Sequence, residues 1–205
     1  MFDLDGLLLD SEDAWGRAEE RVVRELGQPW DPAVRTLLLG KGPTDAARAL
    51  AGFLGLADVA GVERRMLAAA TAEFDAGLDA RPGAQALLDA LDGNVPCGVA
   101  TNSRRVLADM ALEALGWMTR FPVVVCAEDV ARPKPAPEPY LTACARLGAD
   151  PSRAVCLEDS PIGVASARAA GMWVIGCPSF PGERLDAAHA VVASLVDLSA
   201  PPAHR

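Results

Sequence analysis

Histidine is almost missing from the 205-residue sequence, which contains only His189 and His204, both near the C-terminal end. A catalytic triad built on histidine, or a histidine-rich zinc site, is therefore strongly disfavoured. The sequence also lacks any apolar run of about 18 residues, and no basic segment followed by an apolar stretch stands at its start. We therefore expect a soluble, cytoplasmic protein that does not associate with membranes.

Cysteine is scarce as well, and its distribution argues against disulfides. The cysteines are odd in number, widely spaced and mostly within apolar stretches, and none forms a CxxC pair. This pattern is typical of reduced, buried side chains in a cytosolic protein. The residues concerned are Cys97, Cys126, Cys144, Cys156 and Cys177.

Positive charge is the third deficit. Nineteen Lys and Arg side chains stand against 28 Asp and Glu side chains, which gives a net charge of −9. Because such a surface repels phosphate backbones, we expect no nucleic-acid partner. A small anionic substrate would need a locally positive site or a bound cation. The hydrophobic share of 51% is enough for a core of its own, and no obligate protein partner is evident.

Short apolar segments alternate with amphipathic helical patterns through most of the sequence. The strand-like segments are rich in Val, Ile or Cys and end at turn or helix signals. Strict alternation of this kind predicts a parallel sheet with right-handed crossovers, which is a doubly wound, Rossmann-like α/β fold. We expect strands at 95–100, 122–126, 154–157 and 172–176, and helices at 104–115, 137–147 and 162–170.

Residues 11–80 break this alternation. They contain no convincing strand and show helical patterns throughout, and the alternation of strands and helices resumes only after Arg81. We therefore predict an all-helical cap at residues 11–80, inserted into an α/β core made of residues 1–10 and 81–205. An insertion after the first strand lies over the carboxyl edge of the sheet, where such folds bind ligands. The expected cap helices are 12–26, 31–38, 44–54 and 62–78.

The expected first strand is very short. Only Met1 and Phe2 precede Asp3, whereas a central strand usually has about five residues. Either this strand is unusually short, or the native chain extends upstream of Met1.

Polar side chains follow the carboxyl ends of the expected strands. Because these ends share one edge of a parallel sheet, we expect the side chains to converge on one crevice. The crevice would contain carboxylates, hydroxyl groups, an amide and a lysine. In chain order these residues are Asp3, Asp5, Thr101, Asn102, Ser103, Lys134, Glu158 and Asp159.

Four carboxylates in one crevice repel one another unless a cation neutralises them. Mg²⁺ suits such a site because it prefers oxygen ligands, and neither cysteine nor histidine is at hand for zinc. A carboxylate nucleophile beside Mg²⁺, a lysine and a hydroxyl group suits attack on phosphorus. Taken singly, the residues also fit structural roles: Thr101 could cap a helix, and Lys134 could be a solvated loop residue.

Four motifs carry a resemblance to a known family. They are FDLDGLLLDSE at residues 2–12, VATNS at 99–103, KPAPEPY at 134–140 and CLEDSPIGVASARAAGM at 156–172. In order and spacing the sequence resembles the haloacid dehalogenase-like hydrolase superfamily. Within it, the sequence is similar to the phosphatase and β-phosphoglucomutase-like branch, whose members carry a helical cap after the first strand.

The resemblance implies a role for each matching residue. Asp3 is the expected nucleophile, which forms an aspartyl-phosphate, and Asp5 the expected general acid and base. Thr101, Asn102 and Ser103 would bind the phosphoryl group, together with Lys134, which would also neutralise Asp3. The expected Mg²⁺ ligands are Asp3, the Asp5 carbonyl, Asp159 and, directly or through water, Glu158. Gly6 would let the chain bend so that Asp5 turns inward.

The same resemblance offers other activities. Dehalogenases lack the second aspartate, which is present here as Asp5, and phosphonate-cleaving members replace it and add a cap lysine. The mutases use a histidine on the first cap helix, and that position is Trp15 here, which favours hydrolysis. Arginines remain in the cap, so a second phosphate stays open, although most are expected on solvated helix faces. They are Arg17, Arg21, Arg35, Arg48, Arg64 and Arg65.

Two further cap features enter the prediction. Lys41 in the GKGPT segment is a candidate substrate contact; the segment lacks the P-loop spacing GxxxxGK[ST] and follows no strand. Trp15 and Trp30 are expected to pack in the cap core. The predicted function is a Mg²⁺-dependent phosphatase acting on a small phosphorylated metabolite, such as a sugar phosphate. The alternatives are a sugar phosphomutase and a non-catalytic binding protein on the same fold.

Overall fold

A twisted parallel sheet forms the centre of the core in the computed structural model, which describes residues 1–39, 41–180 and 182–199. One part pairs β1 (Gly98–Ala100) with β2 (Val123–Val125), and all pairs are parallel. The other part has the order β3-β4-β5, formed by Val155–Glu158, Trp173–Gly176 and Ala190–Val191. The α/β fold with a parallel sheet predicted from the alternation is confirmed.

The first strand is reduced to a bridge at Phe2, which joins the two parts of the sheet. Phe2 pairs in parallel with Val99 on one side and with Leu157 on the other. Its N–H donates to the Gly98 carbonyl (2.9 Å), and the N–H of Asp3 donates to the Leu157 carbonyl (3.1 Å). The short segment is therefore anchored from both sides, and Asp3 has a fixed position at the sheet edge.

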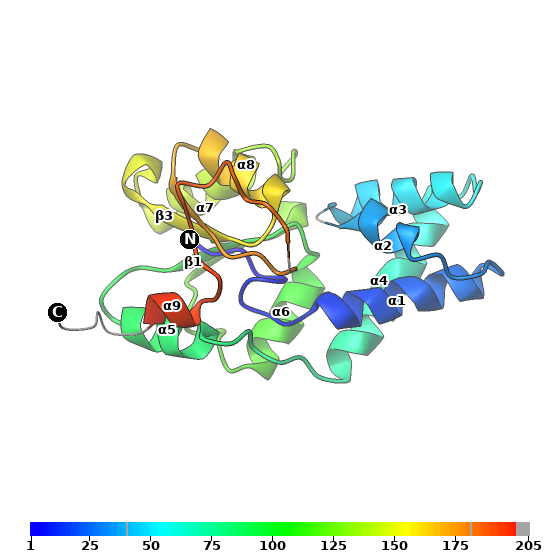
Figure 1. The fold of residues 1–205 in the computed structure, drawn as a ribbon, viewed down its shortest axis with the longest axis horizontal. Coiled ribbons are helices and arrows are strands. Elements are labelled where there is room, and N and C mark those ends of the chain that lie inside the picture. Colours follow the sequence, from blue (N-terminus) through cyan, green and yellow to red (C-terminus); the bar gives the residue numbers. More distant parts are fainter. Residues whose placement is uncertain (40, 181, 200–205) are drawn as a thin grey trace.

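Helices cover both faces of this sheet (Figure 1). Helices α7 and α8 lie on one face, where α7 contacts β1 and β2 and α8 contacts β3 and β4. Helices α5, α6 and α9 lie on the other face (Figure 1). The bounds are α5 Ala84–Leu91, α6 Arg105–Ala114, α7 Glu138–Leu147, α8 Pro161–Ala169 and α9 Val196–Ser199, with short 3₁₀ helices at Ala127–Asp129 and Pro151–Arg153.

Four further helices follow the Phe2 segment and lie beside the core (Figure 1). Helix α1 packs against α4, and α3 packs against α4 and α2. Asp58 caps α4 by accepting from the Gly61 N–H (2.8 Å), and Pro43 begins α3 at a position where no N–H is needed. The bounds are α1 Glu12–Glu25, α2 Ala33–Leu38, α3 Pro43–Phe53 and α4 Val59–Asp75. The division of the chain at residues 10/11 and 80/81 stays a prediction, and residues 200–205 of its core part lie outside the described residues.

Several predicted elements have different bounds in the structure. The strand predicted at 95–100 begins only at Gly98, because Pro96 has no N–H to donate and Val95 is exposed. Helix α4 begins three residues earlier than predicted, at the Asp58 cap. Helices α5 and α9 and the two-residue strand β5 were not predicted. Each is too short for a clear periodic pattern.

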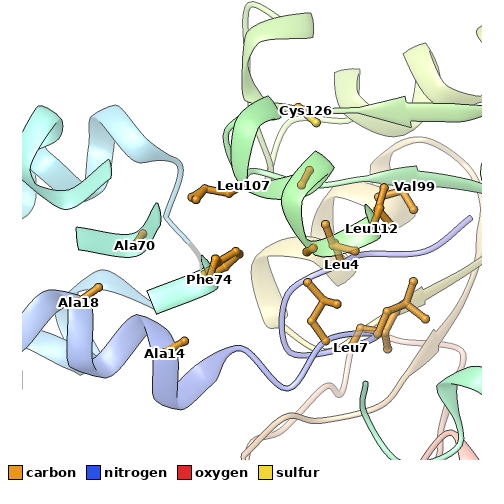
Figure 2. Close-up of a cluster of buried hydrophobic side chains, with 14 of the residues drawn as sticks. Leu4, Leu7, Ala14, Ala18, Ala70, Phe74, Val99, Leu107, Leu112 and Cys126 are labelled. Atoms are coloured by element: carbon orange, nitrogen blue, oxygen red, sulfur yellow. The ribbon is translucent and has the colours of Figure 1, made fainter. Parts of the chain in front are cut away.

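A continuous apolar cluster connects the cap helices with the core (Figure 2). Ala14 and Ala18 of α1 and Ala70 and Phe74 of α4 lie on the cap side. Leu107 of α6 lies next to this group, and the cluster continues to residues around the Phe2 segment and β1. These contacts hold the cap helices close to the sheet edge at which Asp3 stands. Among the described residues, no helix is both long enough and apolar enough to span a membrane.

Candidate active site

Lys134 lies at the centre of a buried polar cluster at the carboxyl edge of the sheet. Its Nζ donates to Asp3 Oδ1 and to Glu158 Oε1, each at 2.6 Å. It also donates to the Tyr140 hydroxyl (3.0 Å), which in turn donates to Glu158 Oε1 (2.5 Å). The side chain is only 3% exposed, so it is not a solvated loop lysine. Its contacts raise its pKa by attraction to Asp3 and Glu158, against the opposing effect of burial.

Three buried carboxylates, from Asp3, Glu158 and Asp159, meet around Lys134. One oxygen from each lies within 4.8 Å of the others. Burial raises the pKa of Asp3 to about 8, although Lys134 lowers it, and burial followed by repulsion from Asp3 and Glu158 raises the pKa of Asp159. When all three carboxylates are ionised, the one ammonium group leaves two negative charges. A divalent cation with a preference for oxygen would balance them, so the residues fit such an ion.

Two glycines make room for these carboxylates. A Cβ on Gly163 in α8 would lie 2.0 Å from the Glu158 carboxylate, so the first turn of α8 can approach Glu158 only because residue 163 has no side chain. Ser160 begins this helix by accepting from the Gly163 N–H (3.1 Å). Gly6 has φ +77°, and a Cβ there would lie 2.2 Å from Asp159 Oδ2. The chain therefore turns sharply after Asp5 and passes directly against Asp159.

Replacing Gly6 by alanine tests this close approach. We expect Gly6→Ala to lower the free energy of unfolding by about 1–3 kcal/mol, because the new methyl group meets Asp159 in a left-handed backbone conformation. Urea unfolding measures this change. Gly52→Ala is the matched control, because a Cβ there has no neighbour within 4 Å and alanine favours the helix. Equal stability of the two variants would contradict the close approach.

The Asp5 carboxylate is held apart from the three others by donors from cap and core. Ser103 Oγ donates to its Oδ2 (2.6 Å), while Ser11 Oγ (2.9 Å) and Trp15 Nε1 (3.0 Å) donate to its Oδ1. The side chain of Asp5 thus stays outside the predicted metal cluster, and its predicted role as a ligand concerns its carbonyl oxygen, which stays a prediction.

Trp15 has a second role that its sequence position did not reveal. It packs edge-on against Phe74 with ring centroids 5.6 Å apart, in agreement with the prediction of a cap-core residue. Its indole N–H nevertheless reaches Asp5. The only signal in the sequence was its place at the histidine position of the mutases.

The predicted phosphate-binding residues lie on the core side of the same site. Thr101 is buried, and its Oγ1 accepts from the Ser103 N–H (3.0 Å). Asn102 binds the backbone of Lys134 through two hydrogen bonds: its Oδ1 accepts from the Lys134 N–H (2.9 Å), and its Nδ2 donates to the Lys134 carbonyl (3.2 Å). The loop that carries Lys134 is thereby attached to the end of β1.

A cavity of about 330 Å³ lies between the cap helices and the sheet edge. Asp3, Asp5, Thr101, Lys134 and Asp159 contribute to its wall, as do Asn102, Ser103 and the exposed Lys41. Glu158 lies behind this wall, fully buried. The cavity therefore brings the predicted residues together, with Glu158 as support for Lys134.

Arg35 differs from the other cap arginines. Arg17 and Arg21 pair with the buried Glu73 but are themselves exposed, and Arg48 pairs with the exposed Asp45, which fits the prediction of solvated faces. Arg35 lines the cavity instead and is 21% exposed. It pairs with Glu12 and, at 2.9 Å, with Glu19 Oε1. Nothing in the sequence indicated that this arginine faces the site, because helix α2 has only six residues and is too short for a clear periodic pattern.

Comparisons with known proteins agree with this arrangement. The sequence model described as Haloacid dehalogenase-like hydrolase matches residues 1–177. Validoxylamine A 7'-phosphate phosphatase of Streptomyces hygroscopicus subsp. limoneus is 37% identical over 184 residues, which are 86% of this chain and 83% of that protein. Fructose-1-phosphate phosphatase YqaB of Escherichia coli is 31% identical and covers 84% of this chain and 92% of its own length. CbbY of Rhodobacter sphaeroides, solved in complex with xylulose-(1,5)bisphosphate, has a TM-score of 0.85 at 28% identity, with 96% and 94% of the two chains covered.

Proposed function

Because the chain belongs to the haloacid dehalogenase-like hydrolases and is a phosphoric monoester hydrolase, we propose that it hydrolyses a sugar phosphate or a related polyol phosphate through an aspartyl-phosphate. The observation that carries this proposal is the buried contact between Lys134 and Asp3, at the wall of a cavity that also contains Asp5. Two similar proteins, from Streptomyces and Escherichia coli, are named as phosphatases of sugar-like phosphates.

Asp3 is the proposed nucleophile. Its carboxylate oxygen forms a bond to phosphorus while the bond between phosphorus and the leaving oxygen breaks. Asp5 gives its proton to that oxygen, so an alcohol leaves. Asp5 then takes a proton from water, whose oxygen attacks the phosphorus and releases inorganic phosphate, and the Asp3 carboxylate is restored. The donors Ser11, Trp15 and Ser103 keep Asp5 next to the leaving group rather than at the carboxylate cluster.

The phosphoryl group would lie between Lys134 and the end of β1. Lys134 supplies a fixed positive charge there, and Thr101, with the Asn102 and Ser103 segment, supplies the polar wall. Asp3, Asp159, Glu158 and the Asp5 carbonyl would hold Mg²⁺, which would neutralise the cluster and the phosphoryl oxygens. The cap would cover the bound substrate and limit the access of bulk water.

The test is phosphate release from a panel of sugar, polyol and short-acid phosphates, with Mg²⁺ and with a chelator. We expect release from one or a few compounds, and loss of at least about 100-fold of it with the chelator. Mg²⁺ should also raise the melting temperature of the chelator-treated protein, because it relieves the repulsion among Asp3, Glu158 and Asp159. Release that persists unchanged in the chelator would contradict the metal site. Silence across the panel would contradict the substrate class.

The thermal shift also depends on pH. The raised pKa values of Asp3 and Asp159 mean that the metal-free fold binds more protons than the unfolded chain above about pH 4. The stability of the metal-free protein should therefore fall as pH rises toward 8. Consequently the gain from Mg²⁺ should be larger at pH 8 than at pH 5.5. A gain independent of pH would mean that these carboxylates do not bind the ion.

A bisphosphate is the second candidate substrate, because CbbY was solved with one. The mutase alternative predicts that a sugar bisphosphate primes isomerisation faster than phosphate is released. Trp15 at the first cap helix argues for hydrolysis, since its N–H can donate to Asp5 but, unlike a histidine, its ring cannot accept a proton. Product analysis by ³¹P NMR distinguishes the two: free phosphate accumulates in one case, and an isomeric monophosphate in the other.

A further inference from the structure

Glu19 of helix α1 has a buried carboxylate, and one of its two oxygens accepts no hydrogen bond from the described residues. The residue is only 5% exposed and lines the cavity between cap and core. Its Oε1 accepts from Arg35 Nη1 (2.9 Å), whereas its Oε2 has no hydrogen-bond partner among the described residues. A buried carboxylate oxygen without a donor is costly, and because Glu19 belongs to the cavity wall, this cost points to a donor on the occupant of the cavity.

Arg35 does not make this part of the cavity positive. Its guanidinium binds Glu19 on one side and the carboxylate and carbonyl of Glu12 on the other. Two carboxylates around one guanidinium leave an excess of negative charge. A second phosphate group next to Arg35 would meet this negative charge, and an ammonium or hydroxyl group would not be repelled.

The neighbouring wall is apolar. Leu38, Met66 and Leu67 line the same cavity from helices α2 and α4. An apolar wall beside a carboxylate suits a sugar-like ring, whose C–H face packs on carbon while its hydroxyl or amino groups point to oxygen acceptors. Burial raises the pKa of Glu19 to about 7, against the lowering effect of Arg35, which is a further cost that a donor on the substrate would reduce.

We propose that Glu19, held in place by Arg35, is the specificity-determining acceptor for the leaving group, and that this leaving group is a polyol or amino-polyol ring without a second phosphate. This inference rests on the proposed function, because it concerns the substrate of the same site. Glu19 Oε2 accepts a hydrogen bond from a hydroxyl or ammonium group of the ring. The reacting phosphate lies at the other end of the cavity, against Lys134.

The experiment compares substrates with and without ring donors. Glucose 6-phosphate and glucosamine 6-phosphate offer hydroxyl groups, and the second also offers an ammonium group, while cyclohexylmethyl phosphate has the ring but no donor. For each, kcat/KM is measured in the wild type, Glu19→Met and Glu19→Gln. We expect the preference for the better sugar phosphate over cyclohexylmethyl phosphate to fall by about 10- to 100-fold in Glu19→Met.

Glu19→Gln separates the two kinds of donor. It keeps a neutral acceptor of the same shape. If Glu19 accepts from a hydroxyl group, Glu19→Gln should retain most of the preference for the sugar phosphate. If Glu19 binds an ammonium group, Glu19→Gln should lose this preference as Glu19→Met does. Glu20→Gln is the matched control, because Glu20 directly follows Glu19 in helix α1 but pairs with Arg24 at the surface. This control should leave all three values within about twofold of wild type.

A preference that stays unchanged in Glu19→Met would overturn the proposal, as would an equal loss on all three esters, which indicates a merely structural role. Faster turnover of fructose 1,6-bisphosphate than of either monophosphate by the wild type would overturn it too. The same preferences are measured as dissociation constants in the Asp3→Asn background, where no turnover is needed. If the proposed hydrolysis is wrong, kcat/KM cannot be measured, but the ratios of the dissociation constants still test the role of Glu19.

Discussion

Asp3→Asn should reduce phosphate release by at least about 10⁴-fold, because the variant loses the proposed nucleophile. The fold should survive. The amide fits the space of the carboxylate, and its loss of charge removes part of the repulsion with Glu158 and Asp159. We therefore expect the metal-free melting temperature at pH 8 to be equal to or higher than that of the wild type. Retention of more than a few per cent of the activity would contradict the mechanism.

The matched control for this variant is Asp10→Asn. Asp10 belongs to the same segment, but it is exposed and lies 3.6 Å from Arg81 outside the cavity. Its replacement should leave activity and melting temperature close to wild type. Equal losses in both variants would indicate that the segment tolerates no amide, which would remove the specific role from Asp3.

The phosphoenzyme itself can be captured. With p-nitrophenyl phosphate, whose leaving group needs no proton, Asp5→Asn should still form the bond to Asp3 but hydrolyse it slowly. Acid quench and peptide mass analysis should then find a phosphoryl group on Asp3. Its appearance on any other residue would exclude Asp3 as the nucleophile.

Much of the candidate site could be foreseen from strand ends alone. The carboxyl ends of parallel strands share one edge, so Asp3, Thr101 and Asp159 had to come together once the sheet was parallel. The short first strand was also visible in the sequence. Its anchoring was not, because it depends on hydrogen bonds that the segment donates to the Gly98 and Leu157 carbonyls, far along the chain.

The cap contacts could not be foreseen in the same way. Whether Glu19 faces the cavity depends on the rotation of α1 about its axis and on its packing against α4, and both are tertiary effects. A glutamate at a helical position is typical of a solvated face, and neighbouring Glu20 has that environment. Only the packed structure distinguishes the two, through the 5% exposure of Glu19 and its contact with Arg35.

Lys134→Met should be the most damaging change to stability. Lys134 donates to both Asp3 and Glu158 in a site that is almost fully buried, so its loss leaves these two carboxylates, next to Asp159, without the ammonium group that contacts them. Breaking a buried ion pair in this way costs about 3–5 kcal/mol. Phosphate release should fall by at least about 10²–10³-fold, because the fixed positive charge at the phosphoryl group is lost.

The stability loss in Lys134→Met should depend on pH, and the direction of this dependence tests the role of the ammonium group. Burial already raises the pKa of Asp3, and without the lowering effect of the ammonium group this pKa rises further above its value in the unfolded chain, so the folded variant gains stability as Asp3 takes up a proton. The stability deficit relative to wild type should therefore shrink as pH falls from 8 to 5, as measured by urea unfolding in chelator. Wild-type Lys134 keeps its proton over this whole range, because its pKa is raised.

The control for this change is the other lysine of the chain. Lys41 is exposed, so Lys41→Met should alter the free energy of unfolding by less than about 0.5 kcal/mol at either pH, whatever it does to substrate binding. Equal stability losses in the two variants, or a deficit of Lys134→Met that grows as pH falls, would show that Lys134 does not neutralise the cluster. The buried ammonium group would then have no part in holding Asp3 as a nucleophile.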